Sequence, residues 1–184
     1  MRELSLHILD IAQNSIAAEA SCIEIEISED TVQDILIISI IDNGKGMDES
    51  FLQKVTDPFV TSRNTRKVGL GISLFKVAAE MCNGIFTIHS AIGKGTTVTA
   101  QFQRSHIDRV PLGNMAETVM TLIMSNEQID YIYKHTLNGK KFVFDTREVK
   151  KVLENVPLGT FEVLDWIKNY IEEGLRELNE AVVG

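Results

Sequence analysis

The sequence contains few cysteines, and their spacing does not indicate a metal site. Cys22 and Cys82 are the only two in 184 residues. Two are too few for the disulfide framework of a small secreted protein, and the wide gap between them lacks the paired cysteines of a zinc site. A disulfide joining them is an alternative that the sequence leaves open. Free thiols in a reducing cytosol are the simpler interpretation.

Long apolar runs and basic clusters are missing as well. No stretch approaches the run of about eighteen apolar residues that crosses a bilayer. The first fifteen residues include Glu3 and Asp10 and have no small-residue cleavage site, so they do not form a signal peptide. The formal net charge is −8, and without a basic patch this argues against binding to nucleic acid or to an acidic membrane. We therefore expect a cytoplasmic protein.

The first 104 residues alternate helical and strand patterns. Apolar residues at helical spacing predict helices over residues 3–19 and 71–82, with a short helix beginning near Asp48. Alternating or continuous apolar runs predict strands over residues 22–28, 34–42, 84–90 and 96–102. Two pairs of strands separated by helices predict an α/β two-layer sandwich, a mixed sheet with helices on one face.

The pattern changes around residues 105–113, and we place a domain boundary there. A helix is expected over residues 114–125, followed by a hairpin that turns at Leu137-Asn138-Gly139. Two further helices are expected over roughly 147–155 and 160–180. Residues 105–184 are thus predicted to be an appended α+β segment that serves interaction or dimerisation.

The first predicted helix carries polar residues on an otherwise apolar surface. His7, Asp10 and Asn14 are three or four positions apart and share one face. A solvated face is the usual reason, but the apolar neighbours favour a face toward a partner or a cavity. The Asn14 amide oxygen suits Mg²⁺, and Asp10 one turn earlier is placed to accept a proton from a nearby water. His7 is expected to have no catalytic role.

The apolar strand over residues 34–42 ends in Asp42-Asn43-Gly44-Lys45-Gly46. Asn-Gly is a strong turn signal, and a turn alone would explain the stretch. A ligand site is the alternative, because an Asp42 carboxylate at a strand end can accept a hydrogen bond from an exocyclic amine such as that of adenine. Gly44 and Gly46, which lack Cβ, would let the backbone approach a flat ring. An EF-hand is excluded because Gln53 occupies the position of its last glutamate.

The segment Gly69-Leu70-Gly71 opens the second helix. A glycine-rich helix N-terminus presents free N–H groups and suits a phosphate. The chain contains no G-x-x-x-x-G-K-[ST] motif, and Leu74 replaces the third glycine of the dinucleotide fingerprint. Arg63 and Lys67 lie just before this segment. They fit a solvated basic loop, and beside a helix N-terminus they also fit a lid over phosphates.

Five short motifs in chain order resemble one superfamily. It comprises the DNA gyrase B subunits, the ninety-kilodalton heat-shock chaperones, the sensor histidine kinases and mismatch-repair MutL, and its motifs are named the N, G1, F, G2 and G3 boxes. The sensor-kinase branch is the most similar over residues 57–81. The matching residues are Asp10-x-x-x-Asn14-Ser15, Asp42-x-Gly44-x-Gly46, Asp57-Pro58-Phe59, Gly69-Leu70-Gly71-Ile72-Ser73 and Gly93-x-Gly95-Thr96-Thr97.

The resemblance implies a Bergerat-type ATP site within residues 1–104. Asn14 would hold Mg²⁺ and Asp42 would bind the adenine amine, with Gly44 and Gly46 beneath the base. Thr96 would support the adenine contact. Residues 59–68, including Arg63 and Lys67, would form an ATP lid, and the backbone of residues 69–71 would meet the phosphates.

Two departures from the family pattern narrow the expected function. Hydrolysing members place a glutamate where this chain has Asp10, which implies slow turnover. No phosphoacceptor-histidine helix precedes Asn14, which argues against a self-phosphorylating sensor kinase. The leading hypothesis is a Mg²⁺·ATP-binding regulator with weak ATPase or protein-kinase activity that acts on an unidentified protein partner. A homodimer is left open. A non-catalytic nucleotide-sensing module is the alternative, and a relic that binds no nucleotide is disfavoured.

Overall fold

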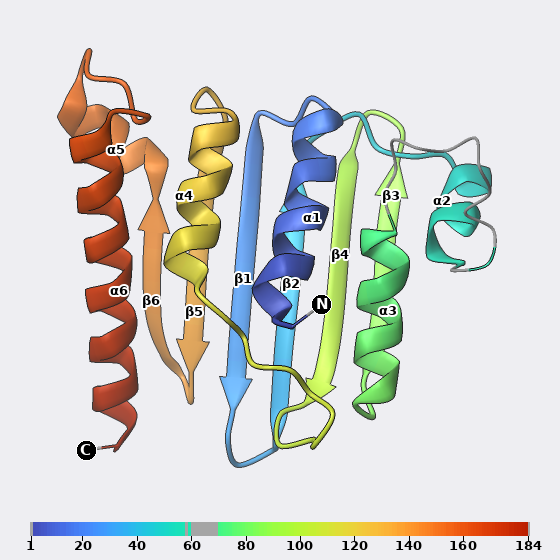
Figure 1. Ribbon diagram of the computed structural model, residues 1–184. Coiled ribbons are helices and arrows are strands. Elements are labelled where there is room, and N and C mark those ends of the chain that lie inside the picture. Colours follow the sequence, from blue (N-terminus) through green and yellow to red (C-terminus); the bar gives the residue numbers. More distant parts are fainter. Residues whose placement is uncertain (1, 58, 60–69, 184) are drawn as a thin grey trace.

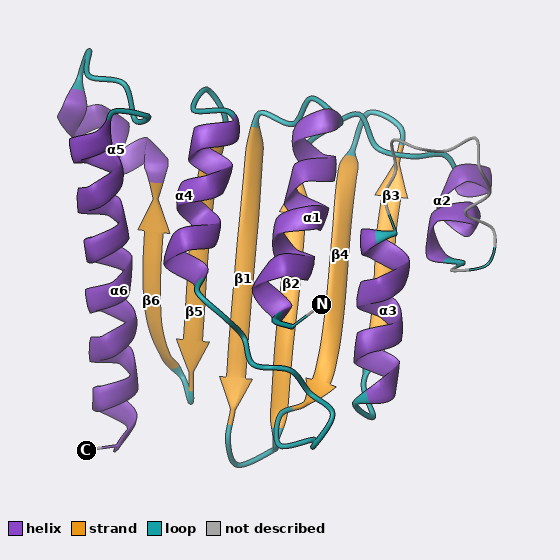
Figure 2. Ribbon diagram, viewed as in Figure 1, coloured by secondary structure: helices purple, strands orange, loops and turns teal. Residues whose placement is uncertain are grey.

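A six-stranded mixed sheet forms one layer of the protein, and helices form the other (Figures 1 and 2). The computed structural model describes residues 2–57, 59 and 70–183. The elements in chain order are α1 (Leu4–Ala17), β1 (Cys22–Asp30), β2 (Ile35–Asp42), α2 (Glu49–Thr56), α3 (Gly71–Met81), β3 (Ile85–Ala91), β4 (Gly95–Gln103), α4 (Met115–Ser125), β5 (Asp130–Leu137), β6 (Lys140–Asp145), α5 (Thr146–Leu153) and α6 (Phe161–Val183).

The strands lie in the order β3-β4-β2-β1-β5-β6. Every neighbouring pair is antiparallel except β1 and β5, which run parallel. Figure 1 shows α1, α3, α4 and α6 on one face of the sheet, with α2 beyond β3 and α5 at the end of β6. The predicted α/β sandwich with helices on one face is therefore confirmed.

The core lies between this helical layer and the sheet. Every second residue of β1 and β2 is buried through the central part of each strand, as expected for strands covered on one side. The register places Ile25 beside Ile40, and Ile38 beside Ala100 of β4. Ile8 of α1 and Phe75 of α3 are fully buried against this surface. The same packing sets the position of α1 over the end of β2.

Residues 105–184 extend the same sheet, because β5 pairs with β1. A polar network crosses this junction on the helix-covered side. The Tyr133 hydroxyl is 2.8 Å from His135 Nδ1, and His135 Nε2 is 2.9 Å from a Glu29 oxygen. Arg104 Nε donates to the other Glu29 oxygen at 2.8 Å. The hydrogen bonds from His135 and Arg104 lower the pKa of Glu29 below its ordinary value.

Element boundaries differ from the sequence-based expectation by a few residues. Strand β1 continues to Asp30, and α6 continues to Val183. Asp48 is the N-cap of α2, and its carboxylate accepts from Phe51 N at 2.8 Å. Asn138 and Gly139 form the β5–β6 turn, both with positive φ. No helix in the described ranges has an apolar stretch long enough to cross a bilayer.

Candidate functional site

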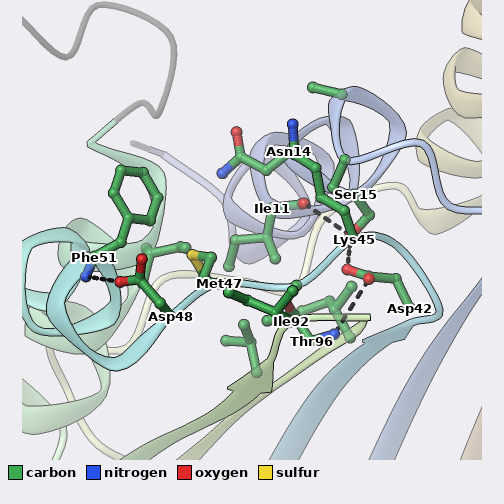
Figure 3. A pocket seen from close by; sticks show the side chains of 16 residues that line it. Ile11, Asn14, Ser15, Asp42, Lys45, Met47, Asp48, Phe51, Ile92 and Thr96 are labelled. Atoms are coloured by element: carbon green, nitrogen blue, oxygen red, sulfur yellow. Dashed lines mark hydrogen bonds between the residues drawn. The ribbon is translucent and has the colours of Figure 1, made fainter. Parts of the chain in front are cut away.

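A cavity of about 580 Å³ lies between α1, the end of β2, the loop that follows it and β4 (Figure 3). Its size is within the range of small-molecule sites. Most of its lining is apolar and includes Ile11, Ile40, Met47, Ile72, Ile92 and Val98. Asn14, Asp42 and Thr96 contribute polar groups to the same lining. The site therefore combines a largely apolar wall with a few oriented polar groups.

Three hydrogen bonds hold the Asp42 carboxylate in place. Oδ1 accepts from Gly44 N at 2.9 Å and from Thr96 N at 3.2 Å, while Oδ2 accepts from Ser15 Oγ at 2.5 Å. A carboxylate oxygen has about two acceptor positions. Oδ1 is thus saturated, whereas Oδ2 keeps one position for an N–H donor. Thr96 lies opposite Asp42 on the adjacent strand, and its hydroxyl is 2.8 Å from that of Ser90.

Two glycines allow the loop after β2 to pack closely against its neighbours. A Cβ on Gly44 would lie 2.8 Å from Ala18 O, and a Cβ on Gly46 would lie 2.0 Å from Ala91 O. Gly46 also has a φ of +70°, which favours glycine. Gly46 lines the cavity, whereas Gly44 is buried against α1. Both are required for loop packing, in addition to the base contact that the sequence predicts.

Asn14 presents an amide with unused hydrogen-bonding capacity. Its Nδ2 is buried and has no hydrogen-bond partner within the described residues. A half-turn of the amide exchanges its oxygen and nitrogen, so Asn14 can offer either atom to a ligand. An amide oxygen is a ligand that Mg²⁺ accepts. The described residues contain no cluster of three or more His, Cys, Asp or Glu side chains suited to a metal. A Mg²⁺ ion would therefore need ligands from a bound phosphate and water in addition to Asn14.

Asp10 packs against the N-terminus of α3 rather than lining the cavity. A Cβ on Gly71 would lie 3.1 Å from Asp10 Cβ and 3.6 Å from its Oδ2. Burial raises the pKa of Asp10 above its ordinary value. Leu70, the residue before α3, makes no side-chain cap. The first N–H groups of an α-helix have no partner within the helix, so those of α3 would suit an anion. Ile72 in this first turn lines the cavity, which places the helix end beside it.

Sequence reasoning missed roles for Ser15 and Lys45. Ser15 orients Asp42, and only its position next to Asn14 pointed to it. Two hydrogen bonds fix the Lys45 backbone. Its N–H donates to Ala18 O at 2.9 Å, and its carbonyl accepts from Gly93 N at 2.8 Å. Its side chain lines the cavity and extends toward Asn14 in Figure 3. Lys45 forms no ion pair within the described residues.

Other predicted residues have different outcomes. Arg63, Lys67 and Gly69 lie outside the described residues, so their assignment to a lid and a phosphate loop stays a prediction. His7 is buried, stacks on Phe75 at 5.5 Å between ring centroids, and does not line the cavity. Burial lowers its pKa to about 4. Cys22 and Cys82 are both free thiols, and burial raises the pKa of each.

A two-layer α/β sandwich with this cavity between its first helix and the end of a central strand defines a ligand-binding domain of the Bergerat class. The model of the family of histidine kinase-, DNA gyrase B- and HSP90-like ATPases matches residues 2–106, more than half of the chain. The chain therefore belongs to this family and contains a histidine-kinase-like ATPase domain. The resemblance seen in the five sequence motifs is confirmed.

Curated relatives are similar over this region. Sporulation kinase D of Bacillus subtilis is 33% identical over 92 residues, which cover 50% of this chain and 18% of that protein. The non-motile and phage-resistance protein of Caulobacter vibrioides is 29% identical over 111 residues, covering 55% and 13%. The chain spans less than a fifth of the length of these relatives.

A solved structure has a similar fold over a larger part of the chain. It is the N-terminal domain of a DNA repair protein, with a TM-score of 0.51 and 17% identity, and the match covers 78% of this chain and 52% of that one. This likeness concerns the fold alone.

Proposed function

We propose that the chain binds ATP with Mg²⁺ in the cavity described above. The observation that carries the proposal is the remaining acceptor position on Asp42 Oδ2, at the edge of an otherwise apolar cavity. An exocyclic N–H of adenine meets both requirements, because a purine is a flat apolar ring with one amino group. Membership of the ATPase family supports the same ligand.

The polar groups beyond Asp42 suit the phosphates. Asn14 would hold Mg²⁺, which neutralises phosphate charge when bound. The first N–H groups of α3 belong to the turn that contributes Ile72 to the cavity lining, and the Lys45 side chain extends toward Asn14. Arg63 and Lys67 are the predicted cations of the lid. Each group supplies positive charge or an N–H donor, as a triphosphate requires.

We further propose that bound nucleotide changes how the chain contacts a protein partner, with slow hydrolysis or phosphotransfer. In this role the Asp10 carboxylate would accept a proton from the attacking water or hydroxyl. Its raised pKa makes it a stronger base than an ordinary aspartate. The cytoplasm is the proposed location.

A second function, nucleotide sensing without catalysis, is favoured by one observation. Asp10 rests on Gly71 and does not line the cavity. Its side chain is also one methylene shorter than the glutamate of hydrolysing relatives. A carboxylate in this position contributes to the packing of α1 on α3 even when it moves no proton. Turnover measurements separate the two functions.

Titration calorimetry of ATP, with and without Mg²⁺, tests the proposal. The Asp42→Asn substitution is expected to weaken binding by about 100-fold, since a hydrogen bond to a charged group contributes about 1.5–3 kcal/mol and the new amide presents an N–H to the adenine amine. Asn14→Ala is expected to remove the dependence on Mg²⁺. Asp108→Asn, an exposed site, is the control. Wild-type affinity in Asp42→Asn would refute the assignment.

A further inference from the structure

A second and larger cavity lies at the far end of the strand order, on β6. It has a volume of about 700 Å³ and is walled by β6, α5 and α6. A neighbouring cavity of about 310 Å³ continues it along α6, and Trp166 and Tyr170 line both. We call the two together the β6 groove. The ATP site does not include any of its residues.

The lining of the β6 groove is mainly apolar and partly open to solvent. Val152 of α5 is 84% exposed and Trp166 of α6 is 53% exposed. Trp166 stacks on Tyr170 at 5.1 Å between ring centroids, and Tyr170 packs on Phe142 at 5.8 Å. The aromatic wall is therefore already formed. Exposed apolar surfaces of this kind mark sites of protein interaction.

The charged residues that line the groove are all acidic. They come from β6, α5 and α6 and are Asp145, Glu148, Glu162, Glu173 and Glu177. No Lys or Arg of the described part of the chain lines either cavity. Arg147, Lys151 and Arg176 pair with three of them. Glu162 and Glu177 have no cationic partner within the described residues. The groove thus presents an apolar base with uncompensated negative charge near each end.

We propose that the β6 groove binds a basic amphipathic helix of a partner protein. The apolar side of such a helix would pack between Val152 and Trp166, and its lysines or arginines would reach Glu162 and Glu177. These two glutamates are about 22 Å apart along α6 at 1.5 Å per residue, a length that a helix of about fifteen residues spans. Laying an apolar helical face into a groove between helices is a common mode of recognition. A second copy of this chain is disfavoured because it would bring two acidic rims together.

The fluorescence emission of Trp166 reports binding in the groove, because Trp166 is the single tryptophan of the chain. The probe is an 18-residue synthetic peptide of leucine and lysine at amphipathic helical spacing. We expect saturable binding with a blue shift of Trp166 emission, and about tenfold weaker binding at high salt. The matching leucine–glutamate peptide is expected to produce no shift. Equal binding of both peptides, or of neither, would overturn the proposal.

Substitutions in the β6 groove test whether the peptide binds there. Val152→Arg should weaken binding by about tenfold or more, whereas Val32→Arg, at a similarly exposed position in the β1–β2 turn, should not. Glu162→Lys combined with Glu177→Lys should weaken the lysine peptide and remove its salt dependence. Unchanged binding in Val152→Arg contradicts the assigned site. Light scattering that shows a dimer with Trp166 shielded before any peptide is added contradicts the assigned partner.

The inference is independent of nucleotide binding. Asp42→Asn changes the ATP site and leaves the β6 groove intact, so this variant should bind the lysine peptide with wild-type affinity. Loss of ATP binding with retained peptide binding would support both proposals. Retained ATP binding in Asp42→Asn, with loss of peptide binding in Val152→Arg, would reject the first and support the second.

Discussion

Ser15 Oγ donates a 2.5 Å hydrogen bond to Asp42 Oδ2 and joins α1 to the end of β2. Ser15 itself is buried. The bond fixes the carboxylate that faces the cavity and leaves one acceptor position on the same oxygen. Ser15, which follows the proposed Mg²⁺ ligand Asn14, therefore orients Asp42, the proposed acceptor for adenine.

Replacing Ser15 by alanine should weaken ATP binding about tenfold, because a hydrogen bond to a charged group contributes about 1.5 kcal/mol or more. Calorimetry of Ser15→Ala against wild type measures this loss. Ser28→Ala, at an exposed position on β1, should bind ATP normally. Equal affinities for Ser15→Ala and Ser28→Ala would show that the hydrogen bond does not serve the ligand.

The Lys45 side chain should contribute to the affinity for ATP and not to the affinity for adenosine, which has no phosphates. Lys45→Met is expected to weaken ATP binding about tenfold and to leave adenosine binding unchanged, since the side chain extends toward Asn14, the proposed Mg²⁺ ligand, in Figure 3. Lys45→Arg keeps the charge and should retain most of the ATP affinity. Parallel titrations with ATP and adenosine check this. A matched loss for both ligands would instead indicate a change in loop structure.

Asp10→Asn should change stability and turnover in opposite directions. Burial raises the pKa of Asp10, so the ionised carboxylate opposes folding at neutral pH. This cost declines as the pH falls below the folded pKa and is gone below the ordinary pKa of an aspartate. The neutral amide should therefore raise the melting temperature at pH 7. If Asp10 accepts a proton in catalysis, release of γ-phosphate should fall at the same time. Unchanged turnover in a stabilised variant would show that Asp10 is not the base, and undetectable turnover in the wild-type protein would favour the nucleotide-sensing function.

Two glycines with similar backbone angles should differ in their tolerance of alanine. Gly46 has φ +70° and a Cβ there would lie 2.0 Å from Ala91 O, whereas Gly93 has φ +75° with nothing within 4 Å. Gly93→Ala should lose about 1 kcal/mol from backbone strain alone. Gly46→Ala should lose about 3 kcal/mol or more, because backbone must also move. Urea denaturation of both variants tests the contrast, and similar losses would contradict it.

Stability should fall between about pH 6.5 and pH 4 because of His7. Burial lowers its pKa from 6.5 to about 4, so in this range the unfolded chain binds a proton that the folded chain does not. The free energy of unfolding then decreases as pH decreases, by up to about 1.4 kcal/mol per pH unit. His7→Leu should flatten this slope in denaturation curves measured across the range.

Glu29 provides the control for the pH experiment. Its lowered pKa contributes stability that is present above the ordinary value of 4.5 and is lost as the pH falls through the folded pKa. Glu29→Gln should therefore alter the pH dependence mainly below about pH 4.5. A steep slope that persists near pH 6 in His7→Leu would assign the effect to another group.

The order of helices and strands could be predicted because it depends on local patterns. Helical spacing in α1, alternation in β1 and the Asn138-Gly139 turn each act over a few residues. The position of Asp42 at a strand end followed in the same way. The resemblance to the family then indicated ATP as the ligand, because no local pattern specifies one.

Contacts between distant segments could not be predicted. The pairing of Ser15 with Asp42 spans 27 positions and depends on how α1 sits over β2. The parallel pairing of β1 with β5 places Ile25 beside Tyr133, although both strands would also satisfy their patterns at a sheet edge. The position of the Lys45 backbone depends on two hydrogen bonds to other segments. Such features depend on packing rather than on local sequence.

The parallel pairing of β1 with β5 has a consequence for any shortened form of the protein. A chain cut after residue 104 would leave β1 with an open row of N–H and C=O groups, and Leu122 and Ile123 of α4 would no longer cover the neighbouring core. An uncovered strand with buried isoleucines along it is a template for pairing with other chains. We therefore expect a chain shortened in this way to aggregate more readily than the protein with residues 105–184.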